Sequence, residues 1–150
     1  NSVWMLIFGS VVARRIGVVR FVVFSMVCAA MGALANLMAY WGSFSILVGA
    51  SGAISGQMAA AIRLMFSGHG RWSDLNNRDV TDMPVLPLRD TLTRRRPLTF
   101  ILVWMAVNFV FGVIGIGASD NIARIAWEAH VGGFVGGLVL FGWFSRSSVR

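Results

Sequence analysis

Five apolar segments separated by short polar ones make up most of this 150-residue chain: residues 1–12, 18–41, 49–66, 98–118 and 125–144. A bilayer core about 30 Å thick needs roughly 20 apolar helical residues, so the last four segments are long enough, or nearly so, to span it. Residues 1–12 would reach only about 18 Å as a helix. Because the chain starts with Asn1 rather than Met, we expect this segment to be the end of a span that begins upstream.

One stretch, residues 67–97, is clearly polar. It contains all three prolines, four of the six acidic residues and the run Arg94-Arg95-Arg96. We interpret residues 1–150 as one all-α membrane domain, a polytopic helical bundle with about five spans, and this stretch as its cytoplasmic loop. The loop could be a regulatory or docking insert, but its length and polarity favour a disordered spacer.

Composition agrees with a membrane protein. The chain is 57% hydrophobic and 13% charged, whereas soluble domains are about 45–50% apolar and about 25% charged. The single cysteine, Cys28, excludes an internal disulfide. With two histidines and one thiol, the chain cannot assemble the ligand sets that hold zinc. We expect neither a metal nor a cofactor.

The basic residues are all arginines, and they flank the apolar segments instead of gathering on a polar domain, which argues against nucleic-acid binding. If residues 1–12 run inward, segments 13–20, 63–97 and 145–150 are cytoplasmic and hold three, seven and two arginines, while the outer segments hold only Arg124. This bias follows the positive-inside rule. The lysine-free composition suggests a bacterial inner membrane.

Polar residues inside apolar segments are functional candidates because they are costly in lipid. Ser51 lies in GASGAISG and His130 in WEAHVGGFVGG, and both sequences have glycines four apart that allow helices to approach closely. The predicted orientation puts both residues at a similar depth near the outer face. Since a histidine can take the proton of a serine hydroxyl, they form a candidate catalytic dyad. The simpler interpretations are that Ser51 caps a helix and His130 bonds a neighbouring helix.

The remaining polar residues have simpler interpretations. Asn36, Gln57 and Asn108 are expected to make interhelical hydrogen bonds. Glu128 could orient His130, but residues two apart on a helix point in different directions, so a catalytic role is disfavoured. Cys28 is interpreted as inert packing.

The two glycine-framed motifs, in this order, resemble those of the rhomboid family of intramembrane serine proteases. The start of the chain looks like the family's second membrane helix, where an H-x-x-x-N motif precedes a Phe-Gly pair and a basic turn: Asn1 matches the Asn and Phe8-Gly9 the pair. The resemblance implies that Ser51 is the nucleophile and His130 the general base and acid. It also implies that the Asn1 amide and the Ser51 backbone N–H stabilise the oxyanion. The implied partners are transmembrane protein substrates in the lipid bilayer, cut near the outer face.

The chain departs from the family pattern at two positions. Ser55 replaces an aromatic residue that packs on the histidine ring, so another residue must hold the imidazole, and Ala13 replaces an acid in the basic turn. Ser55 keeps open an alternative function, a catalytically inactive rhomboid-like protein that binds membrane clients. A small transporter or channel is disfavoured, because the apolar segments hold almost no charge near the bilayer midplane.

Overall fold

The computed structural model describes residues 1–42, 49–67, 80–81, 83–114 and 126–146. Within these ranges the chain forms helices and no strand, which confirms the predicted all-α fold class. The helices are α1 (Ser2–Trp4), the π-helical stretch η1 (Met5–Gly9), α2 (Ser10–Ile16), α3 (Val18–Ala39), α4 (Ser51–Met65), α6 (Leu88–Thr93), α7 (Arg95–Ile114) and α8 (Trp127–Arg146).

The predicted apolar segments correspond to the long helices, except that α7 begins early, at Arg95 rather than at residue 98, and that the first basic turn is helical. Residues 13–16, which we expected to break the helix, belong to α2, and Gly17 makes the turn into α3 with a φ of 79°. In the described part of the chain, α3 alone is long and apolar enough to cross a membrane. The count of five spans therefore stays a prediction.

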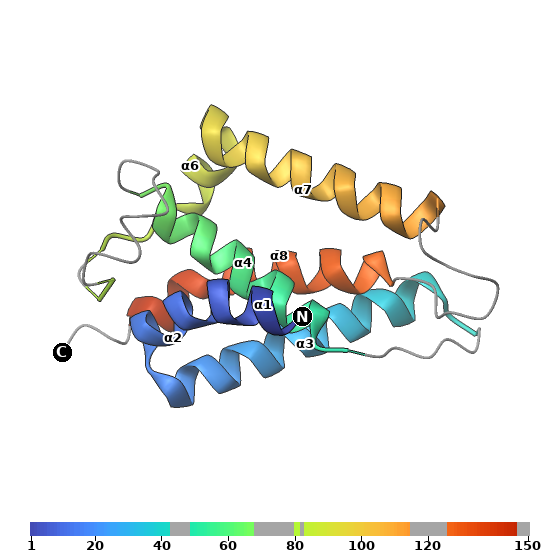
Figure 1. Cartoon of the computed structure of the whole chain (residues 1–150), viewed down its shortest axis with the longest axis horizontal. Coiled ribbons are helices and arrows are strands. Elements are labelled where there is room, and N and C mark those ends of the chain that lie inside the picture. Colours follow the sequence, from blue (N-terminus) through green and yellow to red (C-terminus); the bar gives the residue numbers. More distant parts are fainter. Residues whose placement is uncertain (43–48, 68–79, 82, 115–125, 147–150) are drawn as a thin grey trace.

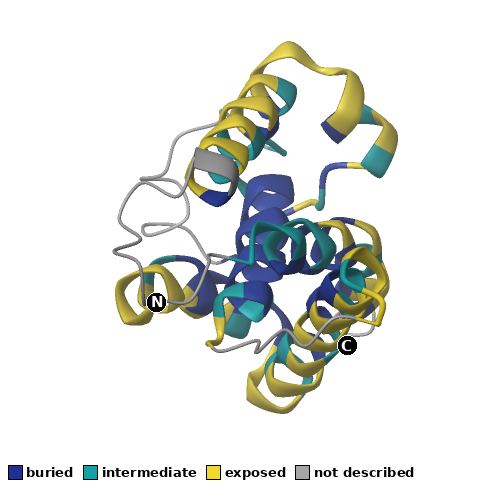
Figure 2. Ribbon diagram, turned by 90° about the vertical axis from the view of Figure 1, so that its right-hand side faces the viewer, coloured by how far each residue is buried: buried dark blue, intermediate teal, exposed yellow. Residues whose placement is uncertain are grey.

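Helix α4 lies at the centre of the molecule (Figures 1 and 2). From Gly52 to Leu64, every residue except Ala53 is buried. A helix that is apolar on nearly all sides is buried either among other elements or in a membrane. Here α3, α8 and the rod formed by α1, η1 and α2 pack around α4, while α7 stands further out (Figure 1).

Glycines allow the three central helices to approach at backbone distance. A Cβ added to Gly133 or Gly137 of α8 would overlap the backbone of Gly52 or Gly56 of α4. The alternate pair, Gly132 and Gly136, faces Met31 and Ala35 of α3 instead. The predicted close-approach motifs are therefore confirmed, and the two glycine pairs of α8 each serve a different neighbour.

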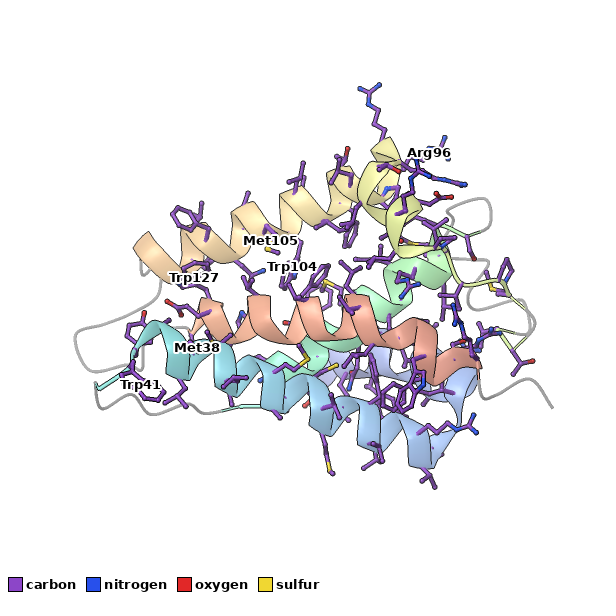
Figure 3. All side chains as sticks on the ribbon, turned by 180° about the vertical axis from the view of Figure 1, so that it is seen from behind. Met38, Trp41, Arg96, Trp104, Met105 and Trp127 are labelled. Carbon is purple, nitrogen blue, oxygen red and sulfur yellow. The ribbon has the colours of Figure 1, made fainter. Side chains whose placement is uncertain are left out.

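The outer surface of the bundle is apolar. Helix α3 exposes Val18, Val19, Met26 and Met38, all at least 61% accessible, and α7 exposes a similar row. Exposed apolar faces of this extent are typical of contact with lipid. Figure 3 shows Trp41 and Trp127 at one end of the bundle and Arg96 at the other, where it points away from the helices.

The described part of the polar stretch, residues 80–81 and 83–97, is packed against the bundle. The prediction that these residues form a disordered spacer is therefore wrong. Val80 and Met83 join the core of α2, α3 and α8. The buried Arg63 donates from Nε to the carbonyl of Leu86 at 2.9 Å and from Nη1 to that of Leu138 at 2.8 Å. Arg63 thereby joins this segment to α4 and α8. Residues 68–79 and 82 lie outside the described residues.

The glycine contacts predict the effect of a single methyl group. Gly137→Ala should lower the free energy of unfolding by roughly 1–3 kcal/mol, because the new Cβ forces α8 away from the Gly56 backbone. Thermal unfolding in detergent measures the change. Gly142→Ala is the matched control, since its Cβ would meet only the end of the Arg63 side chain, 3.2 Å away. Equal unfolding temperatures for the two variants would contradict the packing argument.

Candidate active site

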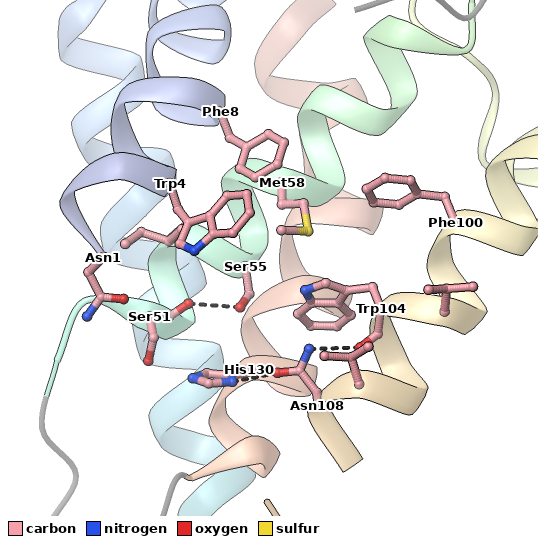
Figure 4. A pocket seen from close by; sticks show the side chains of 13 residues that line it. Asn1, Trp4, Phe8, Ser51, Ser55, Met58, Phe100, Trp104, Asn108 and His130 are labelled. Atoms are coloured by element: carbon pink, nitrogen blue, oxygen red, sulfur yellow. Dashed lines mark hydrogen bonds between the residues drawn. The ribbon is translucent and has the colours of Figure 1, made fainter. Parts of the chain in front are cut away.

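A cavity of about 470 Å³ opens between the central helices and α7. Its walls are mostly apolar and come from α1, η1, α4, α7 and α8 (Figure 4). The polar side chains at its edge are those of Asn1, Ser51, Ser55, Asn108 and His130. The cavity therefore brings together the three side chains that the sequence analysis selected, Asn1, Ser51 and His130, and adds Asn108.

Ser51 is the first residue of α4. The cap position before it is held by Ala50, and no side chain caps this helix, so the interpretation of Ser51 as a helix cap is wrong. The side chain is half-buried, and its hydroxyl points toward His130 in Figure 4. Backbone N–H groups in the first turn of a helix have no acceptor within the helix, and the Ser51 N–H belongs to this turn of α4.

His130 lies one turn into α8, and its ring is held from α7. The Nδ1 atom is 2.7 Å from Oδ1 of Asn108, and Nδ2 of Asn108 donates to the carbonyl of Trp104 at 2.9 Å. The opposite edge of the imidazole, which carries Nε2, faces Ser51 in Figure 4. The prediction that Asn108 makes an interhelical hydrogen bond is thus confirmed, with a partner that the sequence did not identify.

Asn1 lies at the start of the rod formed by α1, η1 and α2, with its amide beside Ser51 in Figure 4. The chain that leads into α4 passes next to it: a Cβ on Gly49 would lie 3.5 Å from Nδ2 of Asn1. Gly49 has a φ of 111°, a conformation that glycine adopts without strain. The Asn1 amide and the N-terminus of α4 therefore meet at the same side of the cavity.

Comparison with models of protein families matches residues 1–147 to the rhomboid domain. The chain belongs to the rhomboid family. This family contains intramembrane serine proteases and inactive relatives, and its domain is embedded in the membrane. Neither a curated protein nor a solved structure gives a significant match.

Ser55, where the family resemblance led us to expect an aromatic residue, is buried, and its hydroxyl is bonded to the backbone of its own helix. Its hydroxyl donates to the carbonyl of Ser51 at 2.8 Å. A hydroxyl bonded to the preceding turn of its own helix is a common arrangement for serine in helices. The expectation that another residue must hold the imidazole agrees with the hydrogen bond that Oδ1 of Asn108 accepts from the ring.

Glu128 is directed away from the cavity of this rhomboid, as its helical spacing from His130 predicted. The hydroxyl of Tyr40, at the end of α3, donates to Oε1 of Glu128 at 2.6 Å. This charge-assisted hydrogen bond joins the end of α3 to the start of α8. One oxygen of Glu128 is thus used in a contact between helices, which agrees with the prediction that a catalytic role is disfavoured.

No three side chains of His, Cys, Asp or Glu come together in the described ranges. The expectation of a metal-free and cofactor-free site stays a prediction.

The sequence analysis missed the pairing of Asn108 with His130. The available signal was that Asn108 is the one amide side chain in the fourth apolar segment, but its partner depends on how α7 packs on α8.

The hydrogen bond between Tyr40 and Glu128 can be tested in a double-mutant cycle. Tyr40→Phe and Glu128→Gln should each lower the free energy of unfolding by roughly 1–2 kcal/mol, and the double variant should be little worse than either, because both remove one charge-assisted bond. Serine-probe labelling of Glu128→Gln should stay close to that of the unaltered protein. If Glu128→Gln abolished labelling, Glu128 would be a catalytic acid, which would contradict a structural role for this residue.

Proposed function

We propose that this rhomboid is an intramembrane serine endopeptidase that uses Ser51 as nucleophile and His130 as general base and acid. The observation that carries the proposal is the shared cavity: the Ser51 hydroxyl points toward a histidine whose Nδ1 is already occupied by Asn108. A serine hydroxyl is a weak nucleophile unless a base within hydrogen-bond reach takes its proton. Nε2 of His130, on the ring edge that faces Ser51, is the base that this arrangement offers.

The reaction follows from the positions of these groups. Oγ of Ser51 attacks the carbonyl carbon of a peptide bond while Nε2 of His130 takes the hydroxyl proton. The carbonyl oxygen becomes an oxyanion, which the Ser51 N–H and the Asn1 amide stabilise. Collapse of this intermediate breaks the C–N bond, and His130 gives its proton to the leaving amine. Water, activated by His130, then hydrolyses the acyl-enzyme and restores the Ser51 hydroxyl.

The cavity walls favour an apolar substrate. Besides the polar groups, the lining consists of aliphatic and aromatic side chains: Trp4, Phe8, Ile54, Met58, Phe100, Val103, Trp104 and Val107. Transmembrane or membrane-proximal segments of membrane proteins have matching surfaces. The distribution of arginines supports a site that opens to the outer face, and the composition supports a bacterial inner membrane.

The first test is covalent labelling of the full-length protein in liposomes with a fluorophosphonate probe. Ser51→Ala and His130→Ala should each abolish labelling, and the double variant should be no worse, because members of one catalytic unit are not additive. Ser10→Ala, which removes an exposed hydroxyl on α2, is the matched control and should label normally.

The possible outcomes separate the two functions open to a rhomboid domain. Labelling that disappears with Ser51 supports the endopeptidase. If the folded, unaltered protein does not label, the endopeptidase proposal is wrong, and a catalytically inactive protein that binds membrane clients takes its place.

Asn1 has its own test, the rate of cleavage of a transmembrane substrate. Asn1→Ala should lower kcat by roughly 10²–10³, the usual effect of removing one oxyanion donor. Covalent labelling at saturating probe should persist, because Ser51 and His130 remain. The change should leave KM nearly unaltered, since the oxyanion exists only in the transition state and the intermediate. A rise in KM with an unchanged kcat would show that Asn1 binds substrate instead.

A further inference from the structure

We propose that Asn108 is a positioning residue that fixes the tautomer and the orientation of His130. The inference rests on the proposed function for its effect on catalysis, while its effect on the histidine can be observed without any substrate. The geometry is a chain of two hydrogen bonds, from Asn108 to the Trp104 carbonyl and between Asn108 and His130.

The chemistry of an amide sets the direction of both bonds. The Trp104 carbonyl can only accept, so the Asn108 atom 2.9 Å from it is the NH₂ group. The atom that faces His130 at 2.7 Å is then the Asn108 carbonyl oxygen, which can only accept. Nδ1 of His130 must therefore carry the proton. In the neutral ring this leaves the lone pair on Nε2, the edge that faces Ser51 (Figure 4).

Two other polar side chains near the histidine make hydrogen bonds to groups other than the imidazole. The Ser55 hydroxyl donates to the Ser51 carbonyl, and the Glu128 carboxylate accepts from Tyr40. The Trp104 ring stacks on Phe134 with centroids 4.4 Å apart and planes 21° apart. Within the described residues, Asn108 is thus the side chain that forms a hydrogen bond with the imidazole.

Aromatic contacts hold Asn108 in place on both sides. Trp104, one turn before it, stacks on Phe134 of α8, and Phe109, directly after it, meets Trp127 edge-on with centroids 5.6 Å apart. Both partners belong to α8, the helix that carries His130. The orientation of the catalytic base therefore depends on α7 remaining packed against α8.

Two substitutions separate positioning from simple packing. Asn108→Leu keeps the size of the side chain and removes the acceptor, whereas Asn108→Asp keeps an acceptor for Nδ1–H and introduces a carboxylate into an apolar wall. If Asn108 only fills space, Asn108→Leu should be more active than Asn108→Asp. If Asn108 positions His130, kcat should fall roughly 10²–10⁴-fold in Asn108→Leu with KM nearly unchanged, and Asn108→Asp should recover part of the loss. Leu102→Ala, an exposed position on the same helix, is the control.

The tautomer itself can be read by nitrogen NMR. In ¹⁵N-histidine-labelled protein, the imidazole signal that disappears in His130→Gln is the signal of His130. The neutral ring should carry its proton on Nδ1 in the unaltered protein and in Asn108→Asp, and it should shift toward the Nε2–H form in folded Asn108→Leu.

Each result has one meaning. An unchanged tautomer in Asn108→Leu, or a leucine variant more active than the aspartate variant when both are folded, overturns the positioning role. Absence of serine labelling in the unaltered protein overturns the endopeptidase proposal but leaves the tautomer result standing, so the two failures can be told apart.

Discussion

The approach of α8 to α4 at backbone distance is the constraint on which the rest of the molecule depends. Between membrane helices there is no hydrophobic driving force, so association relies on close van der Waals packing and interhelical hydrogen bonds. Gly133 and Gly137 supply the packing, since any side chain there would overlap the α4 backbone. Ser51 directly precedes Gly52, and His130 lies one turn before Gly133 and Phe134. The contact that joins the helices therefore also brings the two reactive side chains to one cavity.

Polar side chains reinforce this packing at the helix ends and leave the outer surface apolar. The bonds from Arg63 join α4 to α8 and to the segment before α6, and the bond between Tyr40 and Glu128 joins α3 to α8 at the opposite end. Nε of Arg15 donates to Ser145 at 2.9 Å, which joins α2 to the end of α8. Hydrogen bonds in an apolar medium have no competing water, so each bond restricts how the helix ends can move.

The sequence predicted most of this arrangement and missed the features that depend on tertiary contacts. Hydropathy located the long helices, and glycine spacing identified the faces that meet, because both signals are local. The burial of Arg63 could not be predicted, since its partners, the carbonyls of Leu86 and Leu138, are distant in sequence. The packing of Val80 and Met83 was missed for the same reason, because two apolar residues in a polar stretch carry no periodicity. Ser51 and His130 were found from their motifs, whereas the partner of Asn108 was not.

Replacing an aromatic contact by a hydrogen bond changes what holds the histidine. An aromatic residue one turn after Ser51 would support the ring from α4, the helix of the nucleophile, and would not favour either tautomer. The Asn108 carbonyl supports it from α7 and accepts only from the Nδ1–H form. In the proposed mechanism, the nucleophile, the base and the positioning group then come from three different helices. Helices α4 and α8 are joined along their backbones, whereas α7 contacts α8 through side chains. In the proposed mechanism, the position of α7 therefore decides whether the lone pair of His130 stays on the Nε2 atom that faces Ser51.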